Sequence, residues 1–163
     1  MSQPILIDSL AFARGAQLLQ GDLLVADLTR VLDSLADSAG RLVYRVEGRV
    51  GPRGRSQLLL QVDGLLSLCC QRCLDGIEYP LAVRSLLEFV DDENDLTQEE
   101  IEDDSKDFLP AQKELDVVAL IEDEIILALP VVPHHESCVM PQAGQGAAEV
   151  SPFSVLTGLK GKA

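Results

Sequence analysis

The sequence predicts an α+β fold, in which an antiparallel β-meander is packed with helices. Two observations predict this class: apolar residues alternate with polar ones from Arg41 to Phe89, and they recur at helical spacing before and after that region. The chain has 163 residues, of which 47% are hydrophobic, so it can bury one sizeable core. We therefore expect residues 1–138 to form a single domain.

One helix and three strands should build the body of this domain. The helix is expected to begin at Asp27, because apolar residues follow at helical spacing, namely Leu28, Val31, Leu32 and Leu35. The strands should cover residues 41–50, 57–70 and 77–89, with Gly- and Pro-containing turns between them. Cys70 falls in the inward register, and Pro80 requires a sheet edge or a bulge. Three consecutive antiparallel strands describe a meander.

The rest of the chain should contain an acidic loop, a second helix and a tethered tail. Residues 91–114 are expected to form a mobile loop, because their carboxylates repel one another. Asp116 is a good N-cap for a helix that stops at Pro130. We expect residues 139–150 to be a flexible linker. Residues 151–163 should form a short helix that packs on the domain or docks on a partner, with one side lined by Phe153, Leu156 and Leu159.

Two short segments contain nearly all the cysteine and histidine side chains. They are Cys70-Gln71-Arg72-Cys73 and Pro133-His134-His135-Glu136-Ser137-Cys138. They predict a zinc site made of Cys70, Cys73, His134 and Cys138, with His135 as the alternative histidine. Such a site would tie the tip of a hairpin to the end of the second helix. Without a metal, these residues would be buried or reactive thiols. A thioredoxin-type redox role is disfavoured, because this motif enters a turn and does not open a helix.

The charge of the chain is strongly negative but unevenly distributed. The net charge is −14, and only residues 41–84 are net basic. Arg41, Arg45 and Arg49 share one strand face, and Arg72 lies near the end of the sheet, so this face is a candidate contact for the phosphates of structured RNA. The alternative is a solvated face whose arginines pair with neighbouring carboxylates. The acidic loop is either a solubilising segment or a mimic of RNA that binds a basic ribosomal protein.

Four strings of residues resemble a known family, the large ribosomal RNA subunit accumulation proteins, or YceD family. They are the Cys70–Cys73 motif after an apolar strand, Leu115-Asp116-Val117 followed by residues 122–130 (Glu-Asp-Glu-Ile-Ile-Leu-Ala-Leu-Pro), the cluster that ends at Cys138, and Pro152-Phe153-Ser154-Val155-Leu156. They occur in the order found in the family. Residues 1–40 carry little of the family's signature.

The resemblance implies a non-enzymatic cytoplasmic protein that is needed for the accumulation of large-subunit ribosomal RNA, through its processing, protection or assembly. Its partners would be precursor RNA, ribosomal proteins or both. The first rival is an adaptor that binds an RNase or a basic ribosomal protein without touching RNA. The second rival is a zinc-dependent or thiol-based enzyme, which lacks an evident general base near the cysteines. We expect no membrane partner, since no stretch of about 18 apolar residues occurs, and no small-molecule substrate.

Overall fold

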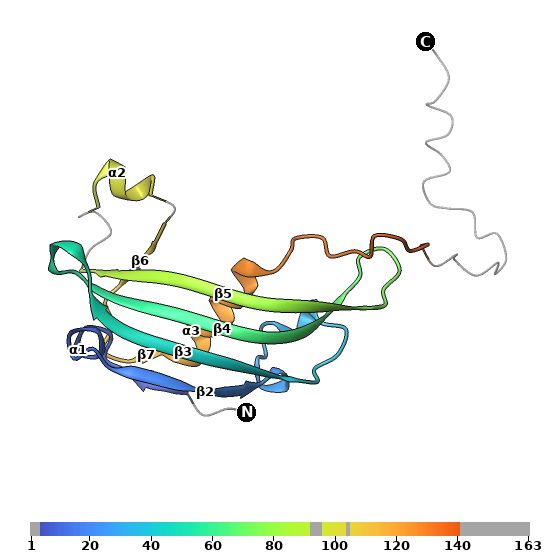
Figure 1. The fold of residues 1–163 in the computed structure, drawn as a ribbon, viewed down its shortest axis with the longest axis horizontal. Helices are drawn as coiled ribbons and strands as arrows, with labels where there is room; N and C mark the ends of the chain where they lie inside the picture. Colours follow the sequence, from blue (N-terminus) through green and yellow to red (C-terminus); the bar gives the residue numbers. More distant parts are fainter. Residues whose placement is uncertain (1–3, 92–95, 104, 141–163) are drawn as a thin grey trace, which may run out of the picture.

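The computed structural model describes residues 4–91, 96–103 and 105–140, and its main element is a five-stranded sheet (Figure 1). The strand order is β2-β3-β4-β5-β6. The strands are β2 (Leu18–Leu24), β3 (Arg41–Val50), β4 (Ser56–Cys69), β5 (Gly76–Val90) and β6 (Asp107–Pro110). Neighbours are antiparallel except β6, which runs parallel to β5. The predicted α+β class is confirmed, and β3, β4 and β5 form the predicted meander.

Short elements and one longer helix complete the fold. They are β1 (Leu6–Ile7), α1 (Ser9–Arg14), the 3-10 turns η1 (Val25–Asp27), η2 (Leu32–Ser34) and η3 (Pro52–Gly54), α2 (Gln98–Ile101), β7 (Leu115–Asp116) and α3 (Val117–Ala128). Strands β1 and β7 pair with each other in a separate antiparallel sheet. No helix among the described residues is long and apolar enough to cross a membrane.

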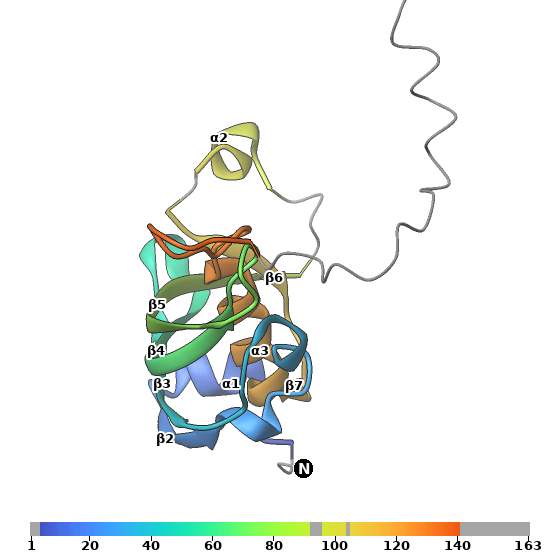
Figure 2. The ribbon, with the colours of Figure 1, turned by 90° about the vertical axis from the view of Figure 1, so that its right-hand side faces the viewer.

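The core lies between one face of the sheet and α3 (Figure 2). On β3, the residues of one face are buried, whereas Arg41, Val43 and Arg45 on the other face are exposed. This alternation is the one expected for a sheet that is covered on one side. Helix α3 contributes its apolar side to the core through Val117, Leu120, Ile121 and Ile125. The alternation of apolar and polar residues therefore determines which face of the sheet is open to solvent.

Helix α3 begins and ends where the sequence predicts. The side chain of Asp116 accepts hydrogen bonds from the backbone N–H groups of Val118 and Ala119, at 2.9 and 3.4 Å. These bonds satisfy amides that have no partner inside the helix. At the other end Leu129 is extended, as expected for a residue that precedes proline.

The helix expected from Asp27 is wrong, because this segment forms two 3-10 turns. The apolar residues Leu28 and Val31 are indeed fully buried. The backbone N–H of Arg30, however, donates to the carboxylate of Glu122 at 3.0 Å, and the Arg30 guanidinium pairs with Asp123 at 2.6 Å. These contacts attach the segment to α3. Within it, the N–H groups of Val31 and Ser34 donate to the carbonyls three residues earlier, at 3.1 and 3.0 Å, as in 3-10 turns. Neither α1 nor β2, which precede this segment, was predicted from the sequence.

The acidic stretch is more ordered than the expected mobile loop at residues 91–114. A capping box starts α2, since the Thr97 side chain and the Glu100 carboxylate each bond the other's backbone N–H. Further along, β6 pairs with β5 from Asp107 to Pro110. Residues 92–95 and 104 lie outside the described part of the chain. The same holds for most of the expected linker and for the whole expected helix at 151–163.

Candidate metal centre

The β4–β5 hairpin ends in a tight turn that carries two cysteines. Strand β4 ends at Cys69 and β5 begins at Gly76. The N–H of Cys70 donates to the Asp75 carbonyl, and the N–H of Leu74 donates to the Cys70 carbonyl, both at 2.9 Å. Leu74 adopts the left-handed conformation, with φ of 67°. This turn buries Cys70 and leaves Cys73 partly exposed at the tip.

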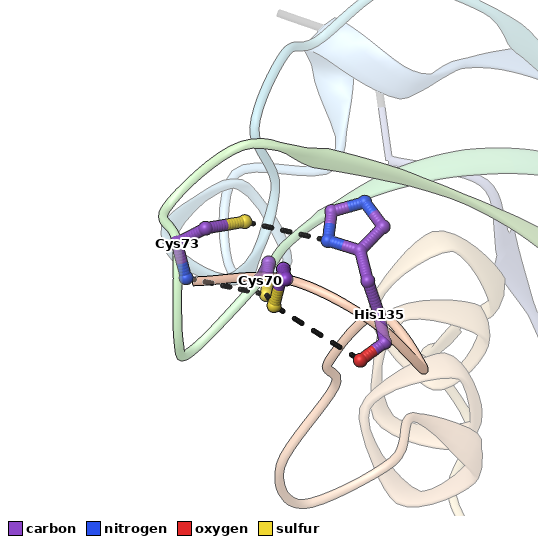
Figure 3. A group of neighbouring side chains, drawn as sticks. Cys70, Cys73 and His135 are labelled. Atoms are coloured by element: carbon purple, nitrogen blue, oxygen red, sulfur yellow. Dashed lines mark hydrogen bonds between the residues drawn. The ribbon is translucent and has the colours of Figure 1, made fainter. Parts of the chain in front are cut away.

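The second donor segment follows α3 and returns to the same turn. Pro130 stops the helix, and residues 131–138 form no helix or strand. The N–H of Gln71 donates to the carbonyl of Pro133 at 2.8 Å, which attaches this segment to the hairpin tip. His135 therefore comes to lie against the turn although it is far from it in sequence (Figure 3). Cys138, in the same segment, has its sulfur close to these donors as well.

Four side chains converge at this point: Cys70, Cys73, His135 and Cys138. Their donor atoms all lie within 4.8 Å of one another. The sulfurs of Cys70 and Cys138 are 3.8 Å apart, and the Cys73 sulfur is 3.3 Å from Nδ1 of His135. Tetrahedral bonds of about 2.3 Å to sulfur and about 2.0 Å to nitrogen give separations of roughly 3.8 and 3.5 Å. The donor set therefore can hold a metal ion with little movement.

The histidine of this cluster is His135, and the choice of His134 from the sequence is corrected. His134 is exposed, and its Nδ1 lies 3.1 Å from the carbonyl of Val132. His135 Nε2 lies 3.2 Å from the carbonyl oxygen of Gly76. An Nε2–H that donates to this carbonyl leaves Nδ1 free to bind a metal, and it also orients the ring. Adjacent histidines in an irregular segment point in different directions, so spacing alone did not separate them.

Hydrogen bonds to sulfur favour one thiolate in this cluster. Burial alone would raise the pKa of Cys70, but the backbone N–H groups of Cys73 and Arg72 lie 3.5 and 3.4 Å from its sulfur. Donation from these groups lowers the pKa of Cys70 to about 5. A backbone hydrogen bond at Asp75 lowers the pKa of Cys73, but burial and the neighbouring sulfurs outweigh it and raise this pKa to about 11. At neutral pH the cluster thus presents a charged ligand to a cation.

The arrangement is closed, with four protein donors around one point. A tetrahedral site with four protein ligands is typical of a structural metal, whereas catalytic sites keep one position for water or substrate. Cys69 does not take part: its sulfur lies 3.7 Å from the Leu74 carbonyl, on the other side of the strand. The outward register expected for Cys69 agrees with this position.

The arginines proposed for RNA contact lie on the open face of the sheet, but they have partners there. Arg41 forms an ion pair with Asp22 on β2. Arg45 pairs with Glu47 at 3.0 Å, and Arg49 donates to the side chain of Gln57 at 3.1 Å. Arg72 is exposed at the hairpin tip, apart from the other three. The remaining contact candidates, Phe153, Leu156 and Leu159, lie outside the described residues.

A buried charged cluster at the opposite end of the sheet was not found from the sequence. Glu88 is only 2% exposed and accepts hydrogen bonds from Gln57 at 2.6 Å, Arg55 at 3.1 Å and Lys106 at 3.3 Å. Burial opposes ionisation of Glu88, but these donors lower its pKa. Arg55 also binds Glu100 at 2.8 Å, which attaches α2 to the sheet. The outward register of Glu88 suggested a solvated residue, and only the fold reveals what covers it.

The comparison with protein families finds one match that covers most of the chain. A family model described as large ribosomal RNA subunit accumulation protein YceD matches residues 58–160. The matched region contains most of β4, all of β5 and α3, and all four members of the cluster. No solved structure matches the chain.

Proposed function

Because the chain belongs to the YceD family of large ribosomal RNA subunit accumulation proteins, we propose that it is a non-enzymatic factor of ribosome biogenesis in the cytoplasm. It would maintain the level of large-subunit ribosomal RNA through processing, protection or assembly. The family match carries this proposal. The closed Cys/His donor set supports a role without catalysis, since it leaves no open coordination position.

The resident metal is proposed to be zinc, bound by Cys70, Cys73, His135 and Cys138. Three sulfur donors and one imidazole nitrogen in a compact set suit zinc better than the hard cations, which prefer oxygen. The ion would stabilise the attachment of the β4–β5 hairpin tip to the segment after α3. Its function there is structural.

The factor is proposed to act by binding a precursor of the large subunit. The contact candidates are the arginine face formed by Arg41, Arg45 and Arg49, the exposed Arg72 at the hairpin tip, and the tail with Phe153, Leu156 and Leu159. Truncation after Ala147 tests the tail. Loss of association by a truncated protein that remains folded would support the tail as a contact, and normal association would remove it from the candidates.

Depletion of the protein from its own cells tests the function itself. We expect the ratio of large-subunit to small-subunit ribosomal RNA to fall, and to recover when the wild-type chain is restored. A Cys73→Ser variant should restore the ratio poorly, and a Cys69→Ser variant should restore it fully, because Cys69 is not part of the cluster. An unchanged ratio after depletion would contradict the proposed function.

The ion pairs on the arginine face favour a second candidate, an adaptor that binds a basic ribosomal protein or an RNase and does not touch RNA. Arg41 and Arg45 already face carboxylates, so phosphates would have to compete for them. Binding of the purified protein to precursor RNA over a series of salt concentrations separates the two. Saturable binding that weakens steeply with salt supports RNA contact, whereas no binding at low salt supports the adaptor.

A further inference from the structure

Strand β5 is paired along only part of its outer edge. Strand β6 pairs with Leu87 to Val90 and with no earlier residue of β5. Among the described residues, no other segment forms a ladder on this side of residues 76–86. At the start of β5, the Gly76 carbonyl is already bound by His135, so the unpaired edge runs from Glu78 to Leu86. Unpaired edges of this kind are templates for another strand.

The direction of the backbone groups on this edge follows from one hydrogen bond. The N–H of Ala111, just after β6, donates to the carbonyl of Val90 at 3.0 Å, so Val90 directs its peptide groups toward the β6 side. Backbone groups alternate sides along a strand, and Glu78, Pro80, Ala82 and Arg84 therefore face the same way. Because Pro80 faces this edge, its missing N–H costs no hydrogen bond with β4, as required for proline in a strand. Glu78, Ala82 and Arg84 offer both N–H and C=O.

A groove runs beside this edge. It has a volume of about 340 Å³ and lies between β5 and the C-terminal half of α3, with Ala82, Ser85 and Leu127 among its lining residues. Leu127 is 77% exposed although it is a large apolar side chain on the core helix. A strand added to β5 would direct every second side chain toward the groove, and one of these could cover Leu127.

The charges in the groove favour a positively charged occupant. Asp107 and Glu124 both line it, and no cation of the described chain pairs with either one. Burial and the charge of Asp107 raise the pKa of Glu124, while Ser85 donates to its carboxylate. The one arginine in the groove, Arg84, is neutralised by Asp63 at 2.8 Å. A positive side chain here would meet carboxylates without a competing cation.

We propose that the edge of β5 from Glu78 to Arg84 is a strand-addition site for an extended segment of a partner protein that carries lysine or arginine. The backbone of the segment would pair with Ala82 and Arg84, its apolar side chains would cover Leu127, and its cations would reach Asp107 and Glu124. This mode provides affinity through main-chain bonds and specificity through alternate side chains. The inference rests on the proposed function only for the source of the segment, which would be a protein of the large-subunit precursor.

The test uses the full chain and a labelled peptide of about eight residues, measured by fluorescence anisotropy. Threonine occupies every second position of the peptide, and valine and lysine alternate at the others, so that both can face the groove. We expect saturable binding. Ala82→Pro removes the N–H that faces the edge and should weaken binding by about fivefold or more, because at least one hydrogen bond is lost. Ala82→Ser keeps this N–H and is the matched control. A peptide of the same sequence with methylated backbone nitrogens on every second residue should bind the wild-type protein weakly. Its affinity should match that of the unmodified peptide for the Ala82→Pro variant.

Two further measurements separate the edge from general charge attraction. The double variant Asp107→Asn, Glu124→Gln should weaken binding several-fold, and the same peptide with glutamate in place of each lysine should not bind. Hydrogen exchange of the wild-type protein should slow at the Ala82 and Arg84 amides when the lysine peptide is bound. This last result does not depend on any variant's folding.

Several outcomes would overturn the inference. Equal binding by Ala82→Pro and Ala82→Ser, together with unchanged exchange at residues 82 and 84, would exclude strand addition. Binding that appears only after residues 148–163 are removed would assign the edge to the chain's own tail. A dimer that Ala82→Pro dissociates would assign it to a second copy. None of these results would change the ribosomal RNA ratio that tests the proposed function, so the two can fail separately.

Discussion

At the scale of single residues, two glutamates on neighbouring layers respond to burial in opposite ways. Glu88 is buried but surrounded by Gln57, Arg55 and Lys106, and these donors lower its pKa. Glu124 is buried against Ser85 with other carboxylates nearby, and its pKa is raised. The surroundings of Glu88 therefore stabilise its ionised form, whereas those of Glu124 stabilise its protonated form.

Replacing each glutamate with glutamine should change stability with opposite signs. The ionised Glu88 stabilises the fold above the pKa that this residue has in the unfolded chain, and this contribution is lost as pH falls through its lower pKa in the folded state. Glu88→Gln should therefore lower the free energy of unfolding by about 1 to 2 kcal/mol at pH 7 and by less in acid. Stability associated with Glu124 is present below its usual pKa of 4.5 and is lost as pH rises through the higher folded value. Glu124→Gln should therefore raise the urea midpoint at pH 7. Urea unfolding at pH 7 and pH 4 measures both, and equal effects at the two pH values would contradict the assignment.

The two adjacent histidines give a matched pair of variants for the metal centre. His135→Ala removes a donor atom, so zinc per chain should fall and the remaining ion should be lost readily to a chelator. His134→Ala removes an exposed ring that lies outside the cluster and should leave the zinc content unchanged. Elemental analysis of both purified proteins measures this. Equal zinc content in the two variants would remove His135 from the ligand set.

At the scale of elements, the spacing of apolar residues predicted the long strands and the long helix correctly. It failed for short segments. Strands β3, β4 and β5 and helix α3 are long enough for their apolar period to identify them. The residues after Asp27 have helical spacing as well, but backbone hydrogen bonds there span three residues, and Arg30 binds Glu122 and Asp123 of α3. Helix α1 has only six residues, which is too short for a period. In the metal centre, the cysteines predicted from the sequence lie together, but the predicted His134 is replaced by His135.

Helix α1 depends on a glycine in β3. A Cβ atom on Gly48 would lie 2.4 Å from the carbonyl oxygen of Phe12 and 2.8 Å from Cα of Ala13, both in the backbone of α1. Gly48→Ala must therefore displace the helix from the sheet, and we expect a loss of about 1 to 3 kcal/mol of unfolding free energy. Denaturant unfolding measures this loss, and faster hydrogen exchange in residues 9–14 should accompany it. An unchanged midpoint would show that α1 moves away without cost.

At the scale of the whole molecule, two clusters of polar side chains lie at opposite ends of the sheet. One end carries the Cys/His cluster, and the other carries the buried contacts of Glu88 and Glu100 that attach α2 (Figure 1). The open face between them is nearly balanced, because Arg41, Arg45 and Arg84 each meet a carboxylate. In the sequence, most of the net negative charge belongs to residues 91–116, between β5 and α3.

Removal of the metal should loosen one end of the molecule and leave the rest folded. The core between the sheet and α3 contains none of the four donors except Cys70. We expect a chelator to lower the melting temperature and to speed hydrogen exchange mainly in residues 70–76 and 130–138. Cys69→Ser should behave as the wild type in the same experiment. Uniformly faster exchange through β3 and β4 would instead mean that the metal is needed for the whole fold.

The separation of Cys70 from Cys138 along the chain also sets an order of events during synthesis. The two cysteines whose sulfurs lie 3.8 Å apart are separated by 68 positions. The hairpin with Cys70 and Cys73 leaves the ribosome first, and the donor set is complete only after all of α3 has followed. Until then the hairpin offers two sulfurs and no imidazole, a weaker site than the complete set. A metal ion that needs all four donors could therefore be bound only after Cys138 has followed the hairpin.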